Sequence, residues 1–120
     1  MKQLWTTLFV NDIEKSMAFY TDVLGLPLNK RYQPVEGIDI AFFGEGETQF
    51  ELIERQDVKG IEHNSFVSTG FQINDVNEFI NHLNKLNIEI IEGPFSPSPQ
   101  MTFFYIEDPD GYKIQLVELS

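Results

Sequence analysis

The chain has 120 residues, no cysteine and a net charge of −11, from 19 acidic and 8 basic residues. This length fits one domain. The absence of cysteine excludes disulfides, thiolate chemistry and cysteine-based zinc sites, and the scarcity of Lys and Arg argues against a nucleic-acid partner. No N-terminal apolar run is long enough for a signal peptide or a membrane span, so we expect a cytoplasmic protein without a membrane partner.

The first half of the chain predicts the element order βαβββ. An apolar, threonine-rich run at residues 4–10 predicts a strand, and Asn11 or Asp12 then provides an N-cap for a helix. Apolar residues recur at helical spacing as far as Gly25, which predicts the end of that helix. Three further strands, separated by glycine-containing turns, are predicted at Leu28–Gln33, Ile38–Phe43 and Thr48–Glu54.

After a polar connector at residues 56–66, the second half predicts the same order. Val67–Ile73 reads as a strand, and Asp75 with Glu78 three residues later is a capping-box-like start of a second helix. The proline-rich stretch Gly93–Pro99 disfavours both a helix and strand pairing, so it predicts a stiff loop. The remaining strands are expected at Ile88–Ile91, Met101–Ile106 and Tyr112–Leu119.

The two halves repeat each other at a spacing of 63 to 64 residues. Asn11-Asp12-Ile13 returns as Asn74-Asp75-Val76, and the strand Phe50–Glu54 returns as Ile114–Glu118. Two copies of one supersecondary unit place matched residues around a shared cleft. The repeat therefore indicates where a functional site would lie.

This organisation resembles the vicinal oxygen chelate superfamily, which includes glyoxalase I, bleomycin-resistance proteins, extradiol dioxygenases and fosfomycin-resistance proteins. The matching stretches are Phe9-Val10-Asn11-Asp12, Phe19-Tyr20, Val23-Leu24-Gly25-Leu26 and Glu107–Glu118, and the resemblance as a whole covers essentially the entire chain. The resemblance implies a single α+β domain of two βαβββ modules, residues 1–55 and 67–120, whose curved mixed sheet surrounds a cleft. It also implies a homodimer.

Metal-dependent members of this family hold a divalent ion with four side chains, one from the first and one from the last strand of each module. The resemblance places these positions at Trp5, Glu51, Ser68 and Gln115. A first-row ion prefers imidazole, carboxylate or thiolate donors. Among the four side chains only Glu51 is a strong ligand, and the Trp5 indole offers no acceptor at all. We therefore expect no metal at these positions and no cofactor.

The two histidines do not complete such a site. His82 falls in the middle of the second predicted helix among polar residues, where we expect a solvated face. His63 falls in the connector and reads as a surface-loop residue, although an irregular start to the second module would bring it toward Ser68.

Without a metal, the four side chains favour binding of a small aromatic or cationic molecule, in the manner of bleomycin-resistance proteins. Trp5 offers a flat stacking surface and one hydrogen-bond donor. Glu51 offers a carboxylate that acts as a counter-ion or as a general acid or base. Ser68 and Gln115 can hydrogen-bond to the same ligand.

The sequence also allows other interpretations. The resemblance also implies a glyoxalase-type lyase or isomerase, or another enzyme of the superfamily, that uses Glu51 as a base or a weak metal ligand. Alternatively, Glu51 forms an internal polar network with Gln115 or Ser68. In a third interpretation the cleft is vestigial and is filled by rings of the segment Phe103-Phe104-Tyr105, whose facing the sequence does not decide because a bulge after Gly111 would switch it.

Overall fold

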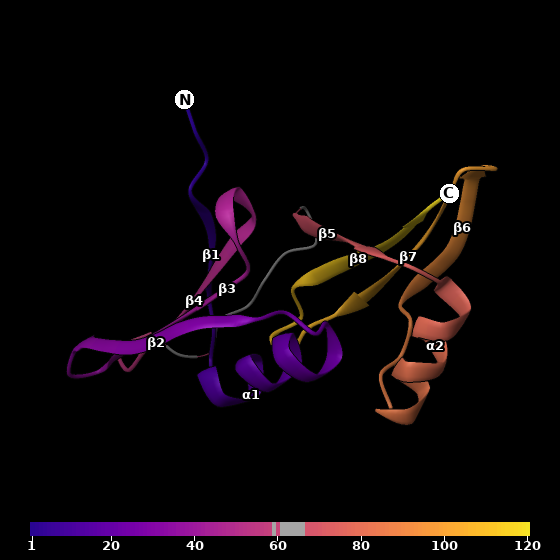
Figure 1. Ribbon diagram of the computed structural model, residues 1–120. Coiled ribbons are helices and arrows are strands. Elements are labelled where there is room, and N and C mark those ends of the chain that lie inside the picture. Colours follow the sequence, from indigo (N-terminus) through magenta and orange to yellow (C-terminus); the bar gives the residue numbers. More distant parts are fainter. Residues whose placement is uncertain (59, 61–66) are drawn as a thin grey trace. The chain divides into compact units, whose positions relative to one another are not determined.

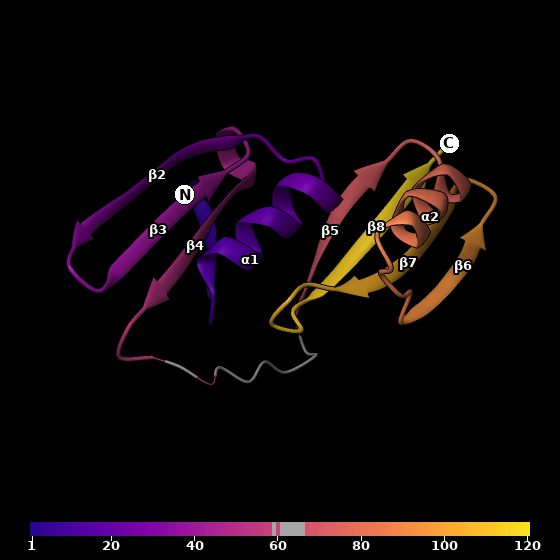
Figure 2. The same ribbon diagram turned by 90° about the horizontal axis from the view of Figure 1, so that it is seen from below.

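The computed structural model describes residues 1–58, 60 and 67–120, which fall into two compact units, Met1–Glu62 and His63–Ser120. Each unit contains one mixed four-stranded sheet, with strand orders β1-β4-β3-β2 and β5-β8-β7-β6, and a helix against one face of that sheet (Figures 1 and 2). The predicted α+β class and the tandem arrangement of modules are confirmed. No helix among the described residues is long and apolar enough to cross a membrane.

The first unit follows the predicted order βαβββ. Its elements are β1 (Trp5–Phe9), α1 (Ile13–Ala18), the π-helical turn η1 (Phe19–Val23), β2 (Leu28–Val35), β3 (Ile38–Phe43), the short 3₁₀ turn η2 (Gly46–Thr48) and β4 (Gln49–Arg55). The carboxylate of Asp12 accepts hydrogen bonds from the backbone N–H groups of Glu14 and Lys15, at 3.0 and 3.3 Å, so the predicted N-cap is confirmed. The helical segment ends at Gly25, which has a φ of 69°.

The second unit repeats the order. Its elements are β5 (Ser68–Ile73), α2 (Val76–Lys85), β6 (Glu92–Ser98), β7 (Met101–Glu107) and β8 (Lys113–Leu119). The Asp75 side chain caps α2 as predicted, because it accepts a hydrogen bond of 2.9 Å from the N–H of Glu78. In both units the first strand pairs in parallel with the last, and the other pairs are antiparallel.

The proline-rich stretch forms most of strand β6, so the prediction of a loop was wrong. β6 lies at the edge of its sheet and pairs with β7 at only three positions, with irregularities between them. An edge strand needs only part of its N–H groups for pairing, so Pro94 and Pro97 are tolerated there. The prediction of a strand at Ile88–Ile91 was also wrong. Asn87, in a left-handed conformation (φ 58°), follows the end of α2, and residues 88–91 connect it to β6.

Each sheet buries the face that carries its helix. In the first unit the buried ring of Tyr20 lies 6.2 Å from that of Phe43, measured between centroids, and Leu52 is fully buried on the same face. In the second unit Phe104 and Leu116 are fully buried, and the ring of Phe79 on α2 lies 6.4 Å from that of Phe104. The opposite face of each sheet carries no helix of its own unit, and we call it the open face.

Candidate functional site

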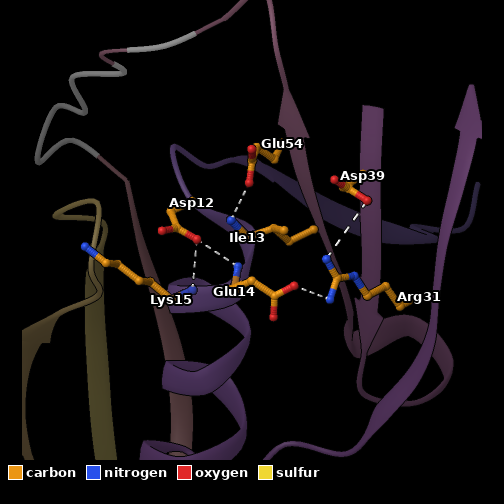
Figure 3. Close-up of polar contacts among 7 residues, drawn as sticks. All are labelled: Asp12, Ile13, Glu14, Lys15, Arg31, Asp39 and Glu54. Atoms are coloured by element: carbon orange, nitrogen blue, oxygen red, sulfur yellow. Dashed lines mark hydrogen bonds and ion pairs between the residues drawn. The ribbon is translucent and has the colours of Figure 1, made fainter. Parts of the chain in front are cut away.

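Two glutamates at matched positions of the sequence repeat bind the N-termini of the helices. Glu54, near the end of β4, accepts a hydrogen bond of 2.7 Å from the N–H of Ile13, the first residue of α1 (Figure 3). Glu118, near the end of β8, accepts one of 2.7 Å from the N–H of Val76, the first residue of α2. A negative charge is favourable at a helix N-terminus, where the backbone N–H groups lack helical partners. These repeated glutamates therefore attach each helix to the last strand of its unit.

The open face of the first unit is organised around one row of residues that crosses all four strands. Glu51 on β4 lies directly beside Thr7 on β1 and beside Phe42 on β3, and Phe42 lies beside Lys30 on β2. Alternate residues of a strand share a face, so Trp5 lies on the same face as Thr7. The first open face therefore presents these five side chains together.

The carboxylate of Glu51 is held in place by a neighbour on β1. Glu51 is only 9% exposed, and the hydroxyl of Thr7 donates a hydrogen bond of 2.7 Å to its Oε1 atom. This contact fixes the orientation of one carboxylate oxygen on the open face. The sequence reasoning missed Thr7, because the partner of Glu51 depends on the register between β1 and β4, and that register places Thr7, two residues beyond Trp5, opposite it.

The indole of Trp5 is an accessible aromatic surface on the first open face, whereas the ring of Phe42 is buried. Trp5 is 43% exposed, and its ring makes an edge-to-face contact with Phe42 at a centroid distance of 5.2 Å. On the other side of Phe42, the Lys30 ammonium lies 4.9 Å from the centre of the Phe42 ring and 5.3 Å from that of Tyr32. The face therefore combines exposed indole surface with one carboxylate and one ammonium.

The open face of the second unit has the same plan with different residues. The corresponding row is Gly70, Gln115, Tyr105 and Glu92. Lys113 lies over the ring of Tyr105, at 4.2 Å from its centre, and forms an ion pair of 3.3 Å with Glu92. The cation on this face is therefore already paired within the unit.

The structure also resolves which rings of the segment 103–105 lie on the open face. Phe103 and Tyr105 lie on it, next to Val117 and Gln115 of β8, and their ring centroids are 5.7 Å apart. Phe104 is fully buried on the helix face.

The four predicted site residues are divided between the units. Trp5 and Glu51 lie on the first open face, while Ser68, which is exposed, and Gln115, which is half-buried, lie on the second. His82 was expected on a solvated face, but it is half-buried against the ring of Phe79, at a centroid distance of 5.3 Å.

The side chains at the four predicted positions do not suit a first-row metal ion. Trp5 has no lone pair to donate, and the Ser68 hydroxyl and the Gln115 amide are neutral oxygen donors. Within the described residues, no group of three or more His, Cys, Asp or Glu side chains is placed to hold a metal ion. His63 lies outside the described residues. The chemistry of these positions is that of hydrogen bonding, aromatic stacking and one fixed carboxylate.

Comparison with known proteins gives consistent matches over nearly the whole chain. A sequence profile described as "Glyoxalase/Bleomycin resistance protein/Dioxygenase superfamily" matches residues 2–116. The lactoylglutathione lyase of Salmonella typhimurium is 34% identical, covering 98% of this chain and 93% of that protein. The corresponding enzyme of Neisseria meningitidis serogroup A is 31% identical, covering 98% of this chain and 91% of that protein.

Solved structures show the same architecture. Glyoxalase I from Leishmania major, described as trypanothione-dependent, is 27% identical and superimposes with a TM-score of 0.80, covering 98% of this chain and 86% of that chain. A glyoxalase family protein from Bacillus cereus is 19% identical and has a TM-score of 0.83, covering 99% of this chain and 94% of that chain. The second likeness concerns the fold alone.

Proposed function

The chain belongs to the glyoxalase/bleomycin resistance protein/dioxygenase superfamily, and from this membership we propose that it binds a small aromatic or cationic molecule on its open faces without a metal ion. The observation that carries the proposal is the first open face, where exposed Trp5 lies on the same face as the fixed carboxylate of Glu51. An indole ring stacks on planar groups and attracts cations through its face. A carboxylate with restricted access to water attracts a cation more strongly than a solvated one does.

The proposal includes Ser68 and Gln115 as ligand contacts on the second open face. Both side chains donate and accept hydrogen bonds, and neither carries charge. We expect these two side chains to form hydrogen bonds with a ligand on the second open face, and Trp5 and Glu51 to supply most of the binding energy on the first. The proposal further includes a homodimer located in the cytoplasm. Light scattering after gel filtration would measure the assembly, and a monomer at all concentrations would contradict that part.

A lyase is the second candidate function, because two relatives that match 98% of this chain, at 34% and 31% identity, are named lactoylglutathione lyase. Here Glu51 would be the base that removes a proton next to a carbonyl group. The donor set at the four positions gives this candidate less support, because only one strong metal ligand is present.

One set of measurements separates the two candidates. Trp5 is the sole tryptophan of the chain, so its fluorescence reports binding of phenethylamine or another cationic aromatic probe on the first open face. We expect Glu51→Gln to weaken phenethylamine binding by about tenfold, because a charge-assisted contact is replaced by a neutral one. Glu36→Gln, in an exposed turn, removes the same charge elsewhere and is the matched control.

The lyase candidate predicts a different result. Calorimetric titration with Ni²⁺, Zn²⁺ and Mn²⁺, combined with an assay of methylglyoxal–glutathione turnover, would then show binding tighter than about micromolar together with activity. That result would overturn metal-independent binding. An absence of any response to aromatic probes would count against a binding protein.

A further inference from the structure

Strand β2 contains an irregularity that determines where Lys30 lies. Leu28 pairs with Phe43, and Lys30 pairs with Phe42, so β2 advances two residues while β3 advances one. The extra residue is Asn29, whose side-chain amide donates a hydrogen bond to the backbone carbonyl of Gly44. With regular pairing, Lys30 would lie beside Ala41 on the helix face. The bulge instead turns its side chain onto the open face.

Lys30 differs in its ion pairing from two comparable basic residues, Arg31 and Lys113. Arg31, the next residue, lies on the helix face and forms ion pairs with Glu14, at 2.5 Å, and with Asp39, at 4.0 Å (Figure 3). Lys113, the lysine on the second open face, is paired with Glu92. Across residues 1–58, 60 and 67–120, none of the ion pairs includes Lys30, and its ammonium lies over the rings of Phe42 and Tyr32. Within the part of the chain that the structure describes, it is thus a cation without an ion-pair partner on a face that we propose to bind a ligand.

The row across the sheet places three kinds of groups in order. Glu51, Phe42 and Lys30 occupy β4, β3 and β2 at directly paired positions. Neighbouring strands are separated by about 4.8 Å, so the backbones of Glu51 and Lys30 are about 10 Å apart, with the aromatic ring between them. The face therefore carries a carboxylate, a ring that is only 4% exposed and an ammonium in that order, and the exposed indole of Trp5 lies against that ring.

We infer that Lys30 binds an anionic group of the ligand, and that the molecule bound on the first open face is an aromatic zwitterion. Its ring would lie against Trp5, its cationic group toward Glu51 and its anionic group toward Lys30. This inference rests on the proposed function and narrows its ligand class, because a purely cationic ligand would leave Lys30 unused and would be repelled by it. The net charge of the chain, −11, disfavours anions in general, so a dedicated cation on this face is what an anionic group would require.

Three small probes test the inference, because they share a phenyl ring on a two-carbon chain and differ in the charged groups that this chain carries. Phenylalanine carries both charges, phenethylamine carries the cation, and 3-phenylpropionate carries the anion. Their affinities are measured by calorimetry and by Trp5 fluorescence. We expect the wild-type chain to bind phenylalanine most tightly. Lys30→Met should weaken binding of phenylalanine and of 3-phenylpropionate by about tenfold and should leave phenethylamine unchanged or slightly improved.

Two further variants separate the role of the charge from general effects. Lys30→Arg keeps the charge and should retain the preference for the two carboxylate-bearing probes. Lys85→Met removes the same charge from an exposed position on α2 and should change none of the three affinities. If Lys30→Met is not folded by circular dichroism, Lys30→Gln takes its place in the same measurements.

The possible failures are distinguishable. If the probes bind the wild-type chain but Lys30→Met changes all three affinities equally, or none of them, the role of Lys30 is overturned and the proposed function is kept. If none of the probes binds the wild-type chain, the proposed function is overturned and this inference with it.

Discussion

The helix faces of the two units are built alike, whereas their open faces are not. On the helix side, Glu54 and Glu118 make the same hydrogen bond to the first residue of their helices, both at 2.7 Å. On the open side, the row that contains Glu51 in the first unit contains Gln115 in the second, and Thr7 is matched by Gly70. Residues that repeat in the sequence therefore maintain the architecture, and residues that differ mark where binding properties would reside.

The difference between the open faces also concerns charge. In the second unit the ammonium of Lys113 is paired with Glu92. In the first unit Glu51 has a hydroxyl partner and Lys30 contacts aromatic rings, so two opposite charges remain for interaction with a ligand. Variants made at matched positions of the two units can break or sharpen this comparison.

The largest effect is expected from the cores. Leu52 and Leu116 occupy matched positions on the helix faces, and both are fully buried. We expect Leu52→Ala and Leu116→Ala each to lower the free energy of unfolding by about 2–5 kcal/mol, because each leaves a cavity in a closely packed core. Denaturant unfolding measures the loss. A large loss for one variant and almost none for the other would contradict the equivalence of the helix faces.

A smaller effect is expected from the repeated glutamates. Glu54→Ala and Glu118→Ala should each cost about 1.5–3 kcal/mol of unfolding free energy, because each removes a charged acceptor from a helix N-terminus. Amide hydrogen exchange should show the loss of protection in the helix of the mutated unit. Glu36→Ala and Glu89→Ala, at exposed positions, serve as controls and should be nearly neutral. Protection lost equally in both helices would show that the contact is not local.

A still smaller change in stability is expected from substitutions on the open faces. Thr7→Val removes the donor to Glu51 and should cost about 1 kcal/mol, whereas Thr7→Ser keeps the hydroxyl and should cost less. At the matched position of the second unit, Gly70→Ala adds a methyl group whose one close neighbour among the described residues is the Gln115 amide oxygen, at 3.4 Å. We expect that variant to change stability by less than about 0.5 kcal/mol. Thermal unfolding of all three variants measures these changes in stability. Equal losses of stability for Thr7→Val and Gly70→Ala would contradict the difference between the two open faces.

The smallest effect is a loss of stability at alkaline pH that arises from one residue of the second unit. Burial, followed by the charges of Asp108 and Asp110, raises the pKa of Tyr112 above its ordinary value of 10.0. Because the folded chain favours the neutral phenol, this contribution to stability is complete below the unfolded pKa and is lost as the pH rises through the folded pKa. Between about pH 9 and pH 11, the unfolding free energy of the wild-type chain should therefore fall more steeply than that of Tyr112→Phe. Identical slopes would show that Tyr112 is not responsible.

Local rules explain what could be predicted from the sequence. The N-caps at Asp12 and Asp75 and the helix end at Gly25 follow from the chemistry of neighbouring residues. The internal repeat and the stretches that match the superfamily indicated the α+β fold and the tandem modules, because they occur in both halves of the chain.

Tertiary structure alone decided which side chains meet on the open faces. The partnership of Thr7 with Glu51 depends on the register between two strands more than 40 residues apart in sequence. The position of Lys30 depends on a bulge at Asn29. Strand β6 tolerates its prolines because it lies at the edge of its sheet, where it pairs with only one neighbour. A shift of one residue in pairing moves every side chain of a strand to the other face. The sequence therefore determined the modules and their helices, and strand pairing determined the chemistry of the surface that we propose to bind a ligand.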